Sequence, residues 1–281
     1  MANLDRLASR IRELRAAPDL EARRGEALAA FAELKDALNR GQARAARRGP
    51  KGWQAEAWVK EGILLGFQIG ALVEMGEAAG LRYFDKETLP LRPWQLADRV
   101  RLVPGGSSVR DGAYVAPGVI CMPPMFINIG AYVDEGAMID SHALVGSCAQ
   151  IGKRVHLSAG AQIGGVLEPV NASPVIVEDD ALIGGNTGVY EGTQVGAGAI
   201  LGAGVILTRS TPLYDLPRDM IHRATDDQPL RVPERAVVVP GARAVKQGRG
   251  PEWGLSLYAP VIVKYRDEKS DRAALLEEWL R

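Results

Sequence analysis

An apolar residue recurs at every sixth position through the middle of this 281-residue chain. The repeat breaks after residue 163 and resumes fourteen positions later. Neither the 3.6-residue period of a helix nor the alternation of an ordinary strand produces this spacing. A parallel β-helix does, because its coil consists of short strands joined by tight turns, with aliphatic side chains stacked along the axis. The repeating residues are Val109, Val115, Cys121, Ile127, Val133, Ile139, Val145, Ile151, Leu157 and Ile163, and then Val177, Ile183, Val189, Val195, Leu201 and Leu207.

The composition agrees with a coil of small repeated corners. Glycine accounts for 32 of the 281 residues, which is above an average usage of about 7%. Aromatic residues make up only 6% of the chain, whereas hydrophobic residues make up 47%. Glycine often follows a repeating residue directly, as at Gly152 and Gly184. We therefore predict a mainly β fold built around the coil.

Helices are expected before the coil. A coil cannot bury its own terminal faces, so a cap is expected at each end. Further helical runs are predicted over residues 20–39 and 55–70, and we assign residues 1–104 to a helical N-terminal domain. Apolar residues near the start of the chain recur at helical spacing: Leu4, Leu7, Ile11 and Leu14.

The coil itself is expected over residues 105–225. A segment with two prolines, residues 165–176, interrupts the register and should leave the coil as a loop. Loops that interrupt a regular solenoid often carry binding function. Strands are predicted at 235–239 and 257–264, bounded by turn residues. Residues 226–281 are therefore expected to form a small β cap and a tail.

Charge and hydropathy argue against several classes of protein. The chain has 34 Lys and Arg against 34 Asp and Glu, so its formal net charge is zero, which disfavours a nucleic-acid binder. No run reaches the roughly 18 apolar residues of a membrane span. The first residues carry charges every few positions, unlike a secretory signal, and two cysteines are too few for a disulfide framework. We expect a cytoplasmic protein without nucleic-acid or membrane partners.

The scarce histidines and cysteines give little support for metal or covalent chemistry. No two histidines form a close pair at ligand spacing, so no metal site is expected. Cys148 is a possible nucleophile, but a small side chain at a corner of the coil is enough to explain it. His142 and His156 are possible general bases, with ordinary surface positions as the alternative. The three histidines are His142, His156 and His222.

Asp140 is the most informative carboxylate in the predicted coil. It directly follows the repeating residue Ile139, so it should project outward from a strand. A carboxylate at that position can orient an amine or accept a proton from it. A solvated surface aspartate is the alternative.

Several longer motifs point to a particular family. They occupy residues 128–136 (NIGAYVDEG), 146–153 (GSCAQIGK), 155–158 (VHLS) and 163–169 (IGGVLEP), with flanking segments at 82–86, 101–104, 210–211 and 259–264. In these segments the sequence resembles the tetrahydrodipicolinate N-succinyltransferases of lysine and diaminopimelate biosynthesis. The resemblance covers most of the chain and is weakest over residues 1–50.

The resemblance implies a left-handed parallel β-helix with an α-helical N-terminal domain and a small β C-terminal cap. It also implies a homotrimer with active sites between subunits. The implied enzyme transfers the acyl group of succinyl-CoA to the nitrogen of (S)-2,3,4,5-tetrahydrodipicolinate. Water opens the cyclic imine, and the products are N-succinyl-2-amino-6-oxopimelate and CoA. No metal is implied.

The resemblance also implies roles for individual residues. Arg101 matches an arginine that binds substrate, where a guanidinium can hold a carboxylate, and Asp140 matches an aspartate of substrate binding and catalysis. The family pairs this aspartate with a glutamate, but here that place holds Gly188. Glu191 is the nearest carboxylate and the first candidate for the missing role. Tyr190 and His142 are the next candidates.

Cationic and hydroxyl groups near the C-terminal cap are candidates for binding the acyl-CoA. Lys246 matches a family lysine, and we expect Lys246 with Arg243 to meet a CoA phosphate, while Ser210 belongs to a further matching segment. A solvated pair of cations is the alternative. Because a related branch of the family uses acetyl-CoA, an acetyl donor is an alternative to succinyl. A non-catalytic β-helix scaffold is the third interpretation.

Overall fold

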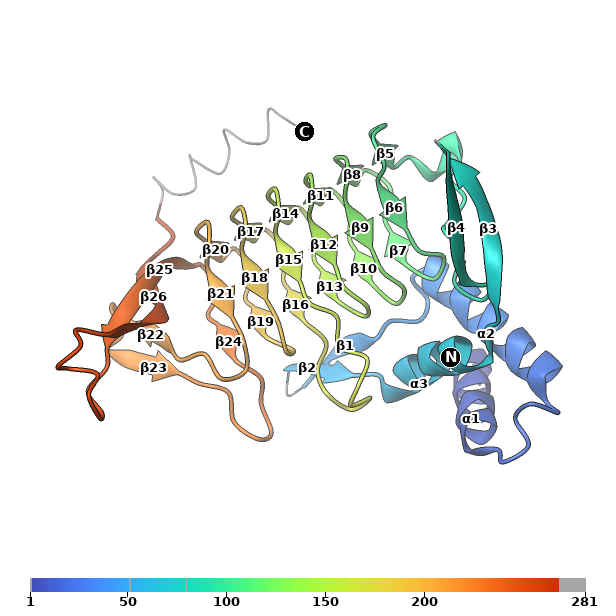
Figure 1. Ribbon diagram of the computed structural model, residues 1–281, viewed down its shortest axis with the longest axis horizontal. Helices are drawn as coiled ribbons and strands as arrows, with labels where there is room; N and C mark the ends of the chain where they lie inside the picture. Colours follow the sequence, from blue (N-terminus) through green and yellow to red (C-terminus); the bar gives the residue numbers. More distant parts are fainter. Residues whose placement is uncertain (1, 51, 79, 268–281) are drawn as a thin grey trace.

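Two-residue strands wind into a three-sided coil that forms the body of the molecule (Figure 1). The computed structural model describes residues 2–50, 52–78 and 80–267. The strands of the coil are β5 (Arg101–Leu102), β6 (Ser108–Val109), β7 (Tyr114–Val115), β8 (Ile120–Cys121), β9 (Phe126–Ile127), β10 (Tyr132–Val133), β11 (Met138–Ile139), β12 (Leu144–Val145), β13 (Gln150–Ile151), β14 (His156–Leu157), β15 (Gln162–Ile163), β16 (Ile176–Val177), β17 (Leu182–Ile183), β18 (Gly188–Val189), β19 (Gln194–Val195), β20 (Ile200–Leu201), β21 (Ile206–Leu207) and β24 (Arg231–Val232).

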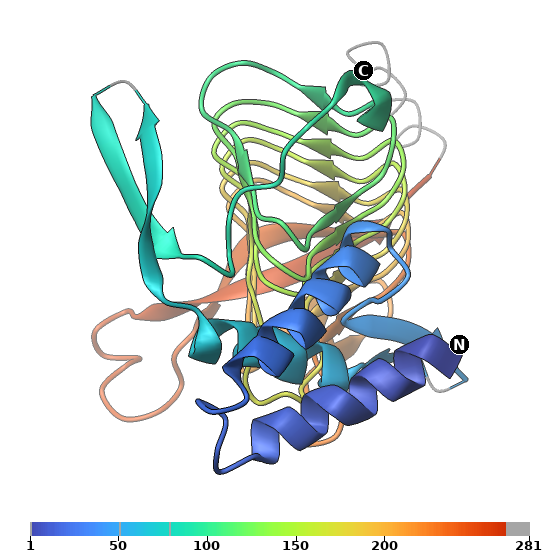
Figure 2. The same cartoon turned by 90° about the vertical axis from the view of Figure 1, so that its right-hand side faces the viewer.

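Each side of the coil is one sheet, seen end-on in Figure 2. Sheet A has the order β7-β10-β13-β16-β19-β24, and sheet B has the order β6-β9-β12-β15-β18-β21. Sheet C contains β5-β8-β11-β14-β17-β20 and continues into the C-terminal strands. Successive strands of the chain visit the three sheets in turn, so neighbours within a sheet are one coil apart and parallel. This topology confirms the predicted parallel β-helix.

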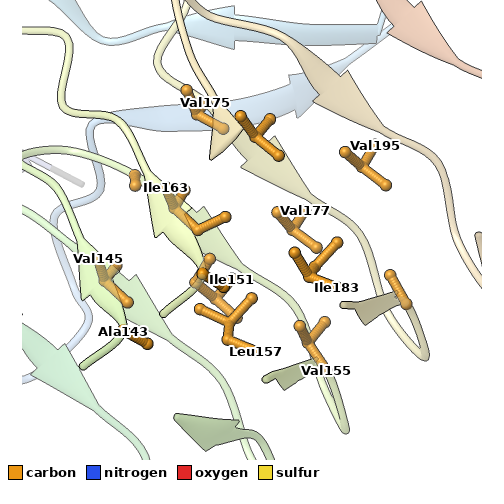
Figure 3. Packing of buried hydrophobic residues seen from close by; sticks show 14 of the residues in the cluster. Ala143, Val145, Ile151, Val155, Leu157, Ile163, Val175, Val177, Ile183 and Val195 are labelled. Carbon is orange, nitrogen blue, oxygen red and sulfur yellow. The ribbon is translucent and has the colours of Figure 1, made fainter. Parts of the chain in front are cut away.

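The repeating apolar residues fill the inside of the coil. All sixteen are buried, and Ile151, Leu157 and Ile163 have no exposed surface. Figure 3 shows these side chains converging on the axis from all three sheets. Burying one such side chain stabilises the fold by about 1.5–3 kcal/mol. The period of six is therefore the spacing of inward-facing positions on a three-sided coil.

Helices precede the coil, as predicted: α1 (Ala2–Ala16), α2 (Arg24–Asn39) and α3 (Ala57–Ile69). They pack closely because α3 presents glycines to its neighbours. A Cβ on Gly66 would lie 2.7 Å from Phe31 Cε1 and closer still to Cε2 and Cζ of the same ring. A Cβ on Gly62 would lie 2.9 Å from Ile11 Cδ1. No helix within the described ranges combines the length and apolar composition that a bilayer crossing needs.

The first hundred residues are not wholly helical, and this corrects the prediction. Two antiparallel pairs occur there: β1 (Ala46–Gly49) with β2 (Gly52–Ala55), and β3 (Leu72–Ala78) with β4 (Leu81–Lys86). The β3–β4 hairpin projects from the body (Figure 2), and its outer residues gain no burial that would impose an alternating apolar pattern. A short 3-10 turn, η1 (Leu96–Asp98), leads into the coil.

The β1–β2 hairpin covers sheet A. Trp53 Nε1 donates a hydrogen bond of 2.8 Å to Glu178 Oε1. The Arg44 guanidinium lies 3.6 Å above the Tyr132 ring, and its Nε donates to Gln150 Oε1 at 3.0 Å. Sheet A is therefore closed by the N-terminal segment.

The C-terminal strands extend sheet C. β25 (Ala236–Ala244) lies parallel to β20 and antiparallel to β26 (Ser256–Tyr265). β22 (Leu213–Asp215) and β23 (Met220–His222) complete this sheet. Buried Asp215 links three of these strands, because its Oδ2 accepts a 2.6 Å hydrogen bond from the Tyr265 hydroxyl and lies 3.0 Å from His222 Nε2. Residues 268–281, the last part of the segment 226–281 expected to form the cap and tail, lie outside the described residues.

The loop between β15 and β16 leaves the coil where the register breaks. Ile176 still pairs with Gln150 on one side and Gln194 on the other, so the strands beyond the loop resume the stack. Fully buried Lys60 of α3 holds the loop by donating a 2.6 Å hydrogen bond to the Ala172 carbonyl. Burial lowers the pKa of Lys60.

Candidate active site

A pocket of about 1080 Å³ lies beside this loop, on the edge where sheet B turns into sheet A. Three successive corners of that edge contribute to it: the loop itself, the corner after β18 and the corner after β21. The lining residues are Gly164, Gly165, Val166, Glu168, Pro169, Ala172, Tyr190, Glu191, Thr208, Arg209, Ser210, Ala224, Thr225 and Asp226. The interrupting loop therefore forms one wall of a concave surface, as expected of loops that leave a solenoid.

The backbone at the loop is packed tightly against the preceding corner. A Cβ on Gly146 would lie 2.7 Å from Gly165 Cα, and one on Gly165 would lie 2.7 Å from Ser147 N. The Val166 amide donates to the Ser147 carbonyl at 3.2 Å. Two glycines thus allow two backbone segments to meet, and that contact sets the position of the pocket wall.

Glu191 lies at the corner after β18, with a positive φ of 53°. Its Oε2 accepts a 2.8 Å hydrogen bond from the Arg209 amide. The Arg209 guanidinium donates to the carbonyls of Thr225 and Asp226, at 2.6 and 3.2 Å. With Glu168, Glu191 and Asp226 against Arg209 alone, the pocket lining carries more negative than positive charge.

The Tyr190 ring occupies the space beside Gly188, where the resemblance leads us to expect a glutamate. A Cβ on Gly188 would lie 3.0 Å from Tyr190 Cζ and closer still to Cε2. No carboxylate can extend from this position while the ring is there. Of the groups that could replace the glutamate, Tyr190 and Glu191 line the pocket and His142 does not.

Asp140 lies on a different edge, at the corner between β11 of sheet C and β12 of sheet B. Its Oδ1 accepts a 2.7 Å hydrogen bond from the Ser141 amide, and its Oδ2 lies 3.9 Å from His156 Nε2. His142 lines a separate hollow of about 400 Å³ nearby. Sequence reasoning did not connect His156 with Asp140. The signal was available, because His156 pairs with Met138 on the adjacent strand.

The other predicted site residues are dispersed. Glu191 and Ser210 line the pocket together, whereas Asp140, Arg101, Arg243 and Lys246 do not. Arg101 is exposed on sheet C, and β5 lies two strands from β11, which corresponds to about 10 Å. Arg243 is exposed in β25, and Lys246 follows that strand.

Neither cysteine is available as a thiolate at neutral pH. Cys121 and Cys148 are buried, and burial raises the pKa of each thiol to about 12. Within the described part of the chain, no three His, Cys, Asp or Glu side chains gather as metal ligands do.

The coil and its edge pocket define the class of hexapeptide-repeat proteins. Residues 174–209 match the model of the hexapeptide repeat of succinyl-transferase, and residues 7–69 match that of the tetrahydrodipicolinate N-succinyltransferase N-terminal region. The chain belongs to the tetrahydrodipicolinate N-succinyltransferase family. This confirms the resemblance seen in the motifs and extends it into the first fifty residues.

The family assignment rests on relatives that align with nearly the whole chain. A 2,3,4,5-tetrahydropyridine-2,6-dicarboxylate N-succinyltransferase of Paramagnetospirillum magneticum is 40% identical over 92% of this chain and 91% of its own. Proteins of the same name from Bradyrhizobium diazoefficiens and Nitrobacter winogradskyi are each 42% identical over 92% of this chain. The alignments cover 91% and 92% of those two proteins.

Proposed function

We propose that this protein is an acyl-CoA-dependent N-succinyltransferase. It transfers the succinyl group of succinyl-CoA to tetrahydrodipicolinate with uptake of water, yielding N-succinyl-2-amino-6-oxopimelate and CoA in lysine and diaminopimelate biosynthesis. The observation that carries the proposal is 40% identity, over 92% of the chain, to a relative of that name. A pocket at the edge of the coil, with a carboxylate facing it, suits an amine acceptor.

The proposed chemistry uses Asp140 and Arg101. The acceptor nitrogen attacks the thioester carbonyl, a C–N bond forms and the C–S bond breaks. Asp140 orients the nitrogen and accepts its proton, which then passes to the departing thiolate. Arg101 holds a carboxylate of the acceptor, and backbone N–H groups of the coil stabilise the oxyanion. No covalent enzyme intermediate and no metal are needed.

The active site is proposed to lie between subunits of a homotrimer. Asp140 and Glu191 lie on different edges of one chain, so a site that uses both needs a second copy. We also propose that the coil of each subunit is left-handed and that the strands after residue 225 form its C-terminal cap. The proposed domains remain 1–104, 105–225 and 226–281.

Succinyl-CoA is proposed to lie along the C-terminal part of the coil, with the protein in the cytoplasm where acyl-CoA is available. Lys246 and Arg243 would bind its phosphates, and Ser210 would contact the chain that carries the thioester. An acetyl donor is the second candidate. It is favoured by Gly188, where the carboxylate expected in the succinyl-transferring family is missing.

The test measures thiol release from succinyl-CoA and from acetyl-CoA, each with tetrahydrodipicolinate. Wild type is compared with Asp140→Asn, which keeps the shape of the side chain but removes its charge. We expect turnover that favours succinyl-CoA and falls at least about 100-fold in the variant, in line with loss of a general base. Preference for acetyl-CoA would support the second candidate. Absence of release from either donor would refute enzymatic function and favour a scaffold.

A further inference from the structure

Tyr190 is held in a slot made by two glycines. A Cβ on Gly164 would lie 2.8 Å from Tyr190 Cδ1, and one on Gly188 would lie 3.0 Å from Tyr190 Cζ. The two glycines belong to neighbouring coils, since Gly164 follows β15 and Gly188 begins β18. The ring therefore lies across the outer surface of sheet B where that sheet meets the pocket.

Both positions require glycine because the Tyr190 ring leaves no room for a Cβ, not because of their backbone conformation. Neither Gly164 nor Gly188 has a positive φ, the region that favours glycine over other residues. An alanine would suit the backbone at each position but would collide with the ring. The slot is therefore specific for an aromatic side chain at residue 190.

The ring forms part of the wall of the 1080 Å³ pocket. Within the described ranges, no protein group hydrogen-bonds with the Tyr190 hydroxyl. A phenol hydroxyl can both donate and accept a hydrogen bond. A residue with a fixed ring and an unengaged hydroxyl at a pocket is suited to contact a ligand.

The charge of the pocket indicates which ligand lies against Tyr190. Glu168, Glu191 and Asp226 line it. The Arg209 guanidinium donates to two backbone carbonyls and lies 4.0 Å from Asp226 Oδ1, so Glu168 and Glu191 carry the excess negative charge. Both ligands are anions, but CoA carries the larger negative charge on its phosphates, which this lining repels most. The nitrogen is the one part of the dicarboxylate acceptor that a carboxylate of the lining attracts, and the acceptor's own carboxylates are held by Arg101 in the proposed site. The ligand beside the ring is therefore the nitrogen-bearing acceptor.

We propose that Tyr190 is a substrate-contacting residue of the acceptor site, and this rests on the proposed acyltransferase function. Its ring packs against the carbon skeleton of the acceptor. Its hydroxyl hydrogen-bonds with the acceptor. Gly164 and Gly188 position the ring.

The test separates the Michaelis constant for the acceptor from that for the acyl-CoA. Tyr190→Phe keeps the ring in its slot and removes only the hydroxyl. We expect the KM for tetrahydrodipicolinate to rise about 3- to 10-fold, the effect of one neutral hydrogen bond, with the KM for acyl-CoA and the melting temperature unchanged. Tyr132→Phe is the matched control, because it also removes one tyrosine hydroxyl, but from sheet A beneath the β1–β2 hairpin. It should change neither the KM for the acceptor nor the KM for acyl-CoA.

A double-substitution cycle tests the slot. Gly188→Ala should displace the ring and raise the acceptor KM about 10-fold or more in the wild-type background. It should have little effect once Tyr190→Ala has emptied the slot, because the two positions are then uncoupled. If Gly188→Ala does not fold, the Tyr190→Phe comparison still decides.

Wild-type turnover establishes the acyltransferase function independently of these variants. Given that turnover, an unchanged acceptor KM in Tyr190→Phe would refute the contact. A rise confined to the acyl-CoA KM would refute the assignment to the acceptor. Equal effects of Gly188→Ala in both backgrounds would refute the slot.

Discussion

Gly146→Ala should move the pocket wall without touching a ligand. The new Cβ would lie 2.7 Å from Gly165 Cα, whereas carbon atoms in contact prefer about 3.5–4.0 Å. The new Cβ would lie closer still to Gly165 N, so the loop backbone must retreat by at least about 1 Å. Overpacking of this kind costs about 1–3 kcal/mol, which lowers the melting temperature by about 2–5 °C in a chain of this size.

The same displacement should impair activity more than stability. Gly165 lines the pocket, and misplacement of a positioning group by about 1 Å can reduce the rate about 100-fold. The assay is thermal unfolding combined with steady-state kinetics of thiol release. We expect kcat/KM to fall at least about 10-fold at temperatures where the variant remains folded.

Gly25→Ala is the matched control. Gly25 lies in α2, and nothing lies within 4 Å of the position its Cβ would take. Alanine in the middle of a helix is favoured over glycine by about 0.5–1 kcal/mol. Gly25 lies in the first turn of α2, where the gain is smaller, so this variant should melt at or slightly above the wild-type temperature and turn over normally. If Gly146→Ala matched Gly25→Ala in both measurements, the close approach would have no energetic or functional role.

Three further outcomes are expected. Mixing Asp140→Asn with Glu191→Gln subunits should restore roughly a quarter of wild-type activity, since a site between subunits of a mixed trimer is intact in one of four combinations; no recovery would place both groups on one subunit. Tyr265 has a pKa raised to about 12 from about 10, so its protonated form adds stability that is present below about pH 10 and lost as pH rises through 12. The stability advantage of wild type over Tyr265→Phe in urea unfolding should therefore shrink between about pH 9 and about pH 11.5, and a constant difference would contradict this. Cys121 and Cys148 are buried, so a thiol reagent such as Ellman's should react with them only after unfolding, and fast native labelling of either would show an accessible thiol.

The coil could be predicted because its signal is local and repeated. Ile151, Leu157 and Ile163 take the same environment on three successive sides, so one spacing rule describes every coil. The β3–β4 hairpin lacks such a rule, because Leu72 and Phe84 are exposed and each strand pairs only with the other. Its sequence carries no burial pattern from which strands could be read.

For the candidate site, the sequence predicted individual residues but not which of them lie together. Glu191 and Ser210 meet because equivalent corners stack along one edge, and a count of coils can reveal that. Two hydrogen bonds depend on where irregular segments fold back: the one from the Arg209 amide to Glu191 and the one from Lys60 to the loop. The Tyr190 ring could not be placed at all without knowing that two glycines flank it in space.

The break between residues 163 and 177 shows that the repeat tolerates insertion. The chain takes fourteen positions there instead of six, yet Val177 stacks between Ile151 and Val195 as if nothing had been added. Corner length is thus independent of strand register, because each strand is positioned by its neighbours one coil away. Such a scaffold can acquire or exchange a binding loop in one step without refolding its core, and the corners of the same edge are therefore natural places to graft new specificity.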